Sequence, residues 1–243
     1  MHRLSLLVAT SLAAVPASAA DLIARKAPLQ ETQVFSWTGF YAGAHLGGGS
    51  VYETQTFLGT TGFAIDPVGT SYTTNRSSVL GGINAGYNYQ VGHVVLGVAG
   101  DVSGTRANGS SVTPAINVPG FVLTSNGRTD WYATLTGRLG VTFDQVLLYG
   151  KGGVAWSRQV YDGRADGFAS VIYSPFSDIR TGYVVGAGAE WAATRNISMF
   201  AEYNYLNFST KTYNVTDTTG AVTTTYSAKT SANLAKLGVN YHF

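Results

Sequence analysis

The stretch Trp131–Phe143, which reads WYATLTGRLGVTF, decides the fold because apolar and polar residues alternate along it without a break. One face carries Trp131, Ala133, Leu135, Gly137, Leu139, Val141 and Phe143, and the other carries Tyr132, Thr134, Thr136, Arg138, Gly140 and Thr142. Strict alternation with a period of two predicts a β-strand whose two faces meet different surroundings.

Seven further segments alternate in the same way, at about residues 39–49, 78–90, 93–104, 146–157, 180–192, 196–208 and 231–243. Each has about ten to thirteen residues, whereas a strand of a soluble protein usually has about five or six. A strand tilted by about 45° needs about 9–11 residues to cross a bilayer. The segment lengths therefore predict strands that cross a membrane.

The composition excludes several classes of protein. Only 12% of the 243 residues are charged and 45% are hydrophobic, whereas an ordinary soluble domain has about 25% charged residues and a disordered chain is poor in apolar residues. The absence of cysteine excludes disulfides and thiolate chemistry. A net charge of +2 gives no reason to expect nucleic acid as a partner. Beyond residue 20, no apolar run is long enough for a membrane-spanning helix.

Charges separate cleanly between the two faces of the eight segments. The apolar face has none, and the opposite face carries Asp101, Arg138, Lys151, Glu190, Glu202 and Lys236. Small residues dominate the charged face, while bulky aromatic residues lie on the apolar face, which is the reverse of a water-soluble fold. A closed barrel in lipid explains this arrangement, because no strand edge can stay unpaired in hydrocarbon.

The six inward charges are expected to form a lumen charge network, because buried charges persist only when they are paired. Glu202 and Lys236 lie on neighbouring segments at similar height. Arg138 and Lys151 are also neighbours, so Glu190 or Glu202 is expected to reach across to them. An eight-stranded barrel has room for its own side chains or one small ligand. We therefore expect a structural plug, with an ion or proton path as the alternative.

The connections between the segments alternate between long and short. Residues 50–77, 105–129, 158–179 and 209–230 form long gaps, and residues 90–92, 144–145 and 193–195 form tight ones. The predicted fold is an all-β, eight-stranded antiparallel transmembrane β-barrel with four long extracellular loops and three short periplasmic turns. Both chain ends would then be periplasmic.

The N-terminus has the layout of an export signal. A basic start at Arg3 precedes an apolar stretch from Leu4 to Val15, and the small residues up to Ala20 suit a signal peptidase. We expect a cleaved signal peptide at 1–20, cut after Ala19 or Ala20, then a periplasmic leader at 21–37 and the barrel at 38–243.

Aromatic residues fall into two tiers that match the two interfaces of a bilayer. The expected girdle residues are Trp131 and Trp156 near the long loops, and Phe143, Trp191 and Tyr241 near the tight turns.

Both ends of the predicted barrel resemble a known family. Residues 37–43, WTGFYAG, and residues 238–243, GVNYHF, resemble the small OmpA-like outer-membrane barrels of Gram-negative bacteria, the "porin family" or immunogenic outer-membrane proteins. The resemblance implies the fold and the outer-membrane location, a role for Phe243 as the C-terminal signal read by the barrel-insertion machinery, and activities that range from structural proteins to hemin binders.

The predicted function is a non-enzymatic, structural and surface-presenting role, with a narrow pore or a hemin- or ligand-binding receptor as the alternative. His45 and His242 are expected to point inward and His93 to lie at a turn, so no histidine has a serine beside it on the lipid face, as a lipid-modifying hydrolase would need. No catalytic residue, metal site or cofactor is expected. Hemin binding would have to use loop tyrosines, namely Tyr52, Tyr72, Tyr161, Tyr173, Tyr213 and Tyr226.

The expected partners are outer-membrane lipid and lipopolysaccharide, the insertion machinery, and a host or environmental ligand at the long loops. A soluble lipocalin-like carrier is the remaining alternative, but it would carry charges on its outer face.

Overall fold

The computed structural model describes residues 35–62, 64, 66–114, 116, 120, 122–166, 171–216 and 220–243, without the side chains of 107–113, 123, 125, 161–165 and 171–176. The predicted signal peptide, and the predicted leader up to residue 34, lie outside the described residues.

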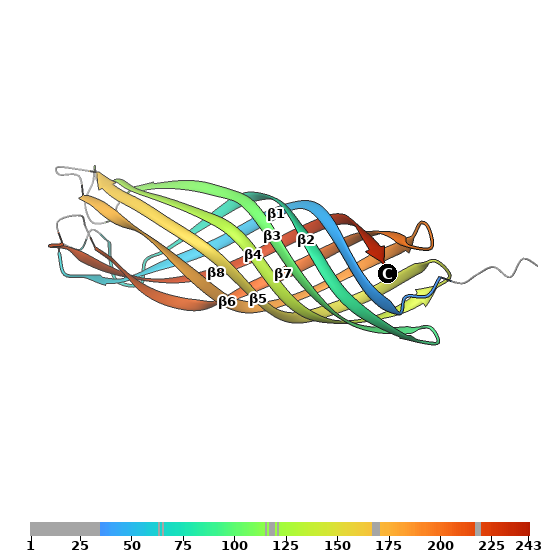
Figure 1. The fold of residues 1–243 in the computed structure, drawn as a ribbon. Coiled ribbons are helices and arrows are strands. Elements are labelled where there is room, and N and C mark those ends of the chain that lie inside the picture. Colours follow the sequence, from blue (N-terminus) through green and yellow to red (C-terminus); the bar gives the residue numbers. More distant parts are fainter. Residues whose placement is uncertain are drawn as a thin grey trace, which may run out of the picture. The chain divides into compact units, whose positions relative to one another are not determined.

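Eight antiparallel strands form a closed barrel in which each strand pairs with the next and the last pairs with the first (Figure 1). They are β1 (Gly39–Thr60), β2 (Ser71–Val91), β3 (Val94–Pro114), β4 (Val122–Phe143), β5 (Val146–Asp166), β6 (Val171–Ala192), β7 (Ile197–Thr216) and β8 (Thr223–His242). The predicted fold class is therefore confirmed. The described residues include no helix long and apolar enough to cross a membrane.

The strands are about twice as long as the sequence predicted, with 20 to 22 residues each. The predicted loop limits of 50–77, 105–129, 158–179 and 209–230 are wrong, because the strands continue into all four. Along these extensions many outward positions are polar, so the alternation is lost while the pairing continues. Thr54 and Thr73, for example, hydrogen-bond on the outer face at 3.0 Å.

The three tight turns and the C-terminus lie at one end of the barrel, and the four longer connections lie at the other (Figure 1). Gly92 and Asp144 take left-handed backbone angles in two of the turns, with φ of 61° and 51°. Glycine adopts that conformation without strain, and aspartate tolerates it better than most residues.

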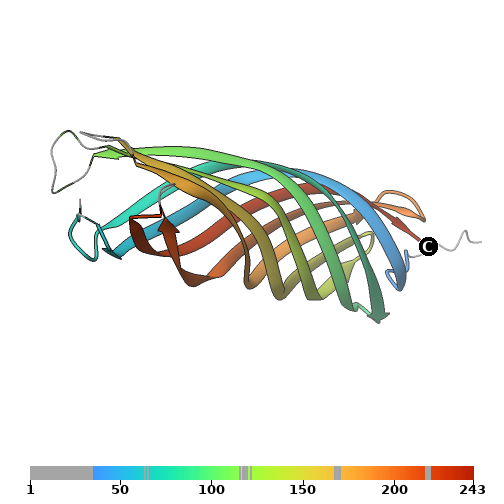
Figure 2. The ribbon, with the colours of Figure 1, turned by 60° about the vertical axis from the view of Figure 1, so that its left-hand side comes forward.

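Towards the long connections, the wall of the barrel divides along two seams. The β2–β3 ladder stops at Leu80 and Thr105, and the β6–β7 ladder stops at Gly182 and Phe208. Beyond these points the described strands form two four-stranded sheets, one from β7, β8, β1 and β2 and the other from β3 to β6. Figure 2 shows the two sheets diverging.

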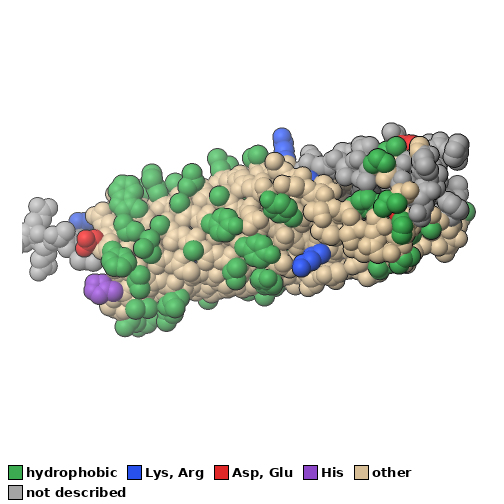
Figure 3. All heavy atoms as spheres, turned by 180° about the vertical axis from the view of Figure 1, so that it is seen from behind, with side chains coloured by type: hydrophobic (Ala, Val, Ile, Leu, Met, Phe, Trp, Pro, Cys, Tyr) green, Lys and Arg blue, Asp and Glu red, His purple; other side chains and the backbone are tan. Residues whose placement is uncertain are grey.

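An apolar outer belt surrounds the half of the barrel that carries the turns. Its side chains are freely exposed, such as Leu46 (73%), Ile83 (66%) and Leu237 (68%). Figure 3 shows the hydrophobic side chains over this half and lysine or arginine side chains projecting where the belt ends. Because so much exposed apolar surface is unfavourable in water, this half is the part that lies in the membrane.

Candidate functional site

The interior of the membrane half holds all six charges singled out in the sequence, and they form three ion pairs. Arg138 pairs with Glu190 at 3.2 Å, Lys151 with Glu202 at 2.6 Å, and Lys236 with Asp101 at 2.7 Å. Each pair joins strands that are not neighbours, so the pairs cross the lumen. We call these six residues the lower ionic layer.

Glu202 and Lys236 are neighbours, as expected, but they do not form an ion pair with each other. Glu202 and Lys236 are register partners on β7 and β8, as the sequence indicated. Lys236 nevertheless bonds to Asp101 on β3, because Lys151 reaches the Glu202 carboxylate from β5. Pairing across the lumen gives each cation its own carboxylate.

Neighbouring polar side chains and tyrosine rings make further contacts with the charges of the lower ionic layer. Glu190 accepts from Ser198 at 2.5 Å and from Asn240 at 2.7 Å. The guanidinium of Arg138 lies over the rings of Tyr41 and Tyr149, 4.8 and 4.9 Å from their centroids, which is a cation–π geometry. These two tyrosines were not predictable, because nothing in the sequence indicates which of its many aromatic residues will meet a given charge.

Two histidines contact the lower ionic layer. His45 contacts Asp101 at 3.3 Å, and His242 contacts Glu190 at 3.4 Å. Both are buried inside the barrel, whereas His93 is exposed at a turn. The described residues contain no group of three metal-ligating side chains.

Little space remains among these groups. A cavity of about 30 Å³ lies between Tyr41, Asp101, Arg138, Lys151 and Glu202, among other side chains. That volume holds one or two water molecules.

An apolar layer follows directly above the lower ionic layer. Its buried members are Val51, Leu80, Tyr132, Ala155, Val184, Leu206, Phe208, Ala232 and Leu234. They come from β1, β2, β4, β5, β6, β7 and β8, and all are at most 2% exposed. The rings of Tyr132 and Phe208 stack with centroids 6.3 Å apart across this layer. This layer was not predicted from the sequence, because bulky side chains were expected on the lipid face and small ones inside.

A second group of buried charges, the upper ionic layer, lies above the apolar layer and consists of Glu53, Arg76 and Arg180. Arg76 forms an ion pair with Glu53, and all three residues are at most 6% exposed. Glu53 and Arg76 were not predicted as site residues, because residues 50–77 were expected to form a loop. Burial and the negative charge of Glu53 raise the pKa of the nearby Tyr213 phenol.

The two arginines of the upper ionic layer connect the separated sheets. Arg180 on β6 donates to the carbonyl of Ala228 and the hydroxyl of Thr230 on β8, at 3.1 and 3.2 Å. Arg76 on β2 packs against Gly127 on β4, where any Cβ would overlap its Nη1 atom. Each arginine therefore reaches from one sheet to the other.

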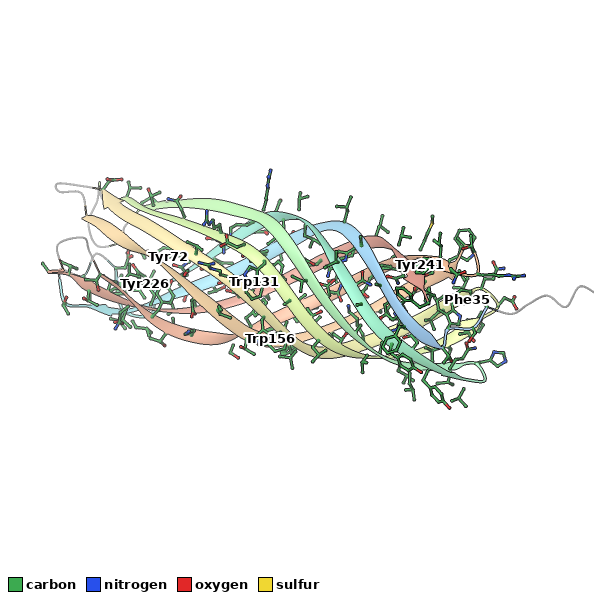
Figure 4. The ribbon with its side chains drawn as sticks, in the orientation of Figure 1. Phe35, Tyr72, Trp131, Trp156, Tyr226 and Tyr241 are labelled. Atoms are coloured by element: carbon green, nitrogen blue, oxygen red, sulfur yellow. The ribbon has the colours of Figure 1, made fainter. Side chains whose placement is uncertain are left out.

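The opposite end of the lumen is filled by the chain just before β1. Trp37 is fully buried in a cluster with Val95, Leu147, Tyr149 and Ala192, and its backbone N–H donates to Gln90 Oε1 at 2.9 Å. Phe35 packs edge-on against Trp37 with centroids 4.7 Å apart. Phe35 and Trp37 were expected in the leader, but the structure places them in the mouth of the barrel. Figure 4 labels Phe35 at this end.

The expected girdle residues lie on outward strand positions. Phe143, Trp191 and Tyr241 are 61%, 48% and 50% exposed, and Trp131 and Trp156 are half-buried. In Figure 4, Tyr241 lies near the turn end, and Trp131 and Trp156 lie about midway along the barrel. Phe243 is 76% exposed, and its N–H donates to the carbonyl of Phe40 at 3.0 Å.

The loop tyrosines whose side chains the structure describes lie in different surroundings. Tyr52 lies on the outer face at 40% exposure, whereas Tyr213 and Tyr226 lie ring to ring with centroids 6.1 Å apart. Burial and the carboxylate of Asp66 raise the pKa of Tyr72. The side chains of Tyr161 and Tyr173 are outside the described set.

Comparison with known proteins gives consistent results. Residues 5–243 match the family described as the outer membrane protein β-barrel domain. The chain is 30% identical over 224 residues to the 22 kDa outer membrane protein of Rhizobium leguminosarum bv. viciae, covering 90% of this chain and 83% of that protein. It is 28% identical over 235 residues to the 31 kDa outer-membrane immunogenic protein of Brucella melitensis biotype 1, covering 95% of both.

Two solved structures share the fold at low sequence identity. The outer membrane protein OprG of Pseudomonas aeruginosa gives a TM-score of 0.52 at 11% identity, covering 85% of this chain and 96% of that one. The outer membrane protease OmpT of Escherichia coli gives 0.51 at 12% identity, covering 88% and 99%.

Proposed function

Since this chain belongs to the outer membrane protein β-barrel domain family, we propose that it is a non-enzymatic component of the Gram-negative outer membrane that strengthens the envelope and presents surface loops, with a lumen closed to solutes. The relatives named above as outer-membrane and immunogenic proteins support this class of role.

The single observation that carries the closed lumen is the apolar layer between two ionic layers. An ion leaving the lower ionic layer would lose its hydration to pass side chains such as Leu206, Phe208 and Leu234. Desolvating a charge in apolar surroundings is very costly. Trp37 adds a second obstruction at the turn end.

The orientation follows the usual rule for bacterial barrels, with short turns in the periplasm and longer connections outside. Both chain ends then lie in the periplasm, residues 1–20 act as a cleaved export signal, and Phe243 carries the signal for insertion. N-terminal sequencing of the mature protein tests the cleavage after Ala19 or Ala20.

Planar bilayer recording tests the closed lumen. We expect no steady current from the wild type, and none from Glu202→Gln, because that change leaves the apolar layer intact while weakening the pair with Lys151. The same variant is expected to unfold at lower denaturant concentration. A large steady current in the wild type would overturn the proposal in favour of a narrow pore. A saturable Soret shift on titration with hemin would favour a hemin receptor.

A further inference from the structure

Three arginines from adjacent strands lie together on the outside of the barrel. Arg106 on β3, Arg128 on β4 and Arg158 on β5 are all exposed. Arg158 is the register partner of Trp131, and Arg128 lies three residues before that tryptophan on the same strand. We call Arg106, Arg128 and Arg158 the arginine patch.

One carboxylate serves two of these arginines. Asp130 lies in a bulge shared by the β3–β4 and β4–β5 ladders, and its oxygens are 3.1 Å from Arg128 Nε and 3.8 Å from Arg158 Nε. No described residue pairs with the terminal NH₂ groups of either arginine, or with Arg106. The arginine patch therefore keeps a surplus of positive charge and several outward-directed N–H donors.

The arginine patch lies at the boundary between the apolar outer belt and the polar outer face. Trp131 lies beside Arg158 on the neighbouring strand, and Trp156 lies two positions from Arg158 towards the turn end. The exposed side chains of Leu135 (58%) and Val154 (41%) follow in the same direction. Tryptophan favours the interface between hydrocarbon and head groups. The guanidinium groups are therefore at the level of the lipid head groups.

The described residues of β8, β1 and β2 carry no charge at the corresponding transition. Where the outer face of β8, β1 and β2 changes from apolar to polar, the row after Gly48 consists of the neutral residues Asn233, Ser50 and Ser77. The arginine patch on β3, β4 and β5 thus has no charged counterpart in this row of β8, β1 and β2.

We propose that the arginine patch binds the phosphorylated head group of an outer-leaflet glycolipid that carries more than one phosphate. The planar guanidinium of arginine can donate two parallel hydrogen bonds to one phosphate. Neighbouring strands are about 4.8 Å apart, so three of them span about 10 Å. That width suits a head group with two phosphates on a sugar scaffold better than a single phosphodiester. The inference rests on the orientation given under the proposed function.

Titration of purified, folded barrel with bis-phosphorylated lipopolysaccharide tests the proposal, with Trp131 and Trp156 fluorescence as the readout. The test variant is Arg106→Gln/Arg128→Gln/Arg158→Gln. The matched control is Lys211→Gln/Lys229→Gln, which removes exposed cations from β7 and β8. We expect the triple variant to lose at least about tenfold in affinity, since charge-assisted hydrogen bonds to phosphate are strong, and the control to change less than about twofold.

Three further ligands separate the possible sources of the anion. Enzymatically dephosphorylated lipopolysaccharide and phosphatidylglycerol vesicles should bind the wild type much more weakly than the intact glycolipid. Equal binding of dephosphorylated lipopolysaccharide, or an unchanged affinity of the triple variant, would overturn the proposal. Inorganic pyrophosphate binding as tightly as the lipid would assign the patch to a free phosphate and would also overturn it.

Migration of unboiled samples on a gel checks that each variant is folded. If the triple variant does not fold, Arg106→Gln alone gives the same comparison at an exposed position with no described ion pair. The arginine patch lies outside the lumen, so bilayer conductance reports on the proposed function independently of this result.

Discussion

Arg138 donates from both of its terminal nitrogens to one oxygen of Glu190, at 3.2 Å each, across the lumen from β4 to β6. Glu190 is fully buried, and Arg138 is 6% exposed. Removal of one partner would leave the other charge without compensation inside the barrel.

We therefore expect Glu190→Ala to lower the free energy of unfolding by about 3–5 kcal/mol, the cost of an unpaired buried charge. Urea unfolding in lipid vesicles, followed by gel migration, measures the loss. The double variant Glu190→Ala/Arg138→Met should recover part of it, because it buries no unpaired charge. Equal stability of the double variant and Glu190→Ala would contradict this explanation.

Loss of Arg180 should loosen the two outer sheets while the membrane half stays folded. Arg180→Ala removes donors to Ala228 and Thr230 on the other sheet. We expect faster hydrogen exchange in residues 171–181 and 209–216 and unchanged exchange in the membrane half, because locally stabilised segments open separately. Arg195→Ala, at an exposed turn, is the control. A uniform increase along every strand would argue against a role confined to the outer sheets.

Closure of the barrel between β1 and β8 should depend on Gly49. An added Cβ there would overlap the carbonyl oxygen of Asn233, whereas a Cβ at Gly137 meets nothing within 4 Å. We expect Gly49→Ala to destabilise the barrel by about 1–3 kcal/mol through backbone displacement. Gly137→Ala should be neutral or slightly stabilising. Paired urea unfolding curves compare the two, and similar midpoints would show that the seam accommodates the methyl group.

Quenching of fluorescence by brominated lipids should distinguish tryptophans on the outside of the barrel from the tryptophan inside it. In variants that retain a single tryptophan, with phenylalanine at the other three positions, Trp191 (48% exposed) should be quenched and Trp37 (0%) should not. Trp131 and Trp156 should be quenched most by bromines close to the head groups. Strong quenching of Trp37 would place that side chain outside the barrel mouth.

Phe243→Ala should impair assembly but not the stability of the folded barrel. The side chain is 76% exposed, and its ring contacts Tyr241 edge-on at 5.1 Å, so the fold gains little from it. Pulse–chase fractionation of expressing cells should show delayed insertion, and urea unfolding of inserted protein should be unchanged. Tyr241→Ala, on the same outward face, is the control. Normal insertion kinetics would remove Phe243 from the insertion signal.

The membrane half was predictable from the sequence because lipid imposes a strict rule on it. Residues such as Leu135 and Leu139 must be apolar where hydrocarbon touches them, and the intervening Arg138 must be polar or small, so the period of two is visible. Strand number, order and the inward position of the charges follow from that rule.

The outer half was not predictable for the same physical reason. There, water touches both the outer strand face and the loops, so Thr54 on a strand has the same character as a residue in a loop. The buried Glu53 was hidden within this polar region. Ion-pair partners were also beyond the sequence, because Asp101 and Lys236 lie 135 positions apart and meet only through the curvature of the barrel.

The two seams above the bilayer have a consequence for recognition by antibodies. The strand pairs β1–β2 and β7–β8 belong to one sheet, and the pairs β3–β4 and β5–β6 belong to the other. An antibody whose footprint includes both sheets would bind only while they keep their spacing, whereas one raised against a hairpin of a single sheet would bind regardless. On intact cells, binding of the first antibody relative to the second would report whether the two four-stranded sheets keep the spacing seen in the structure.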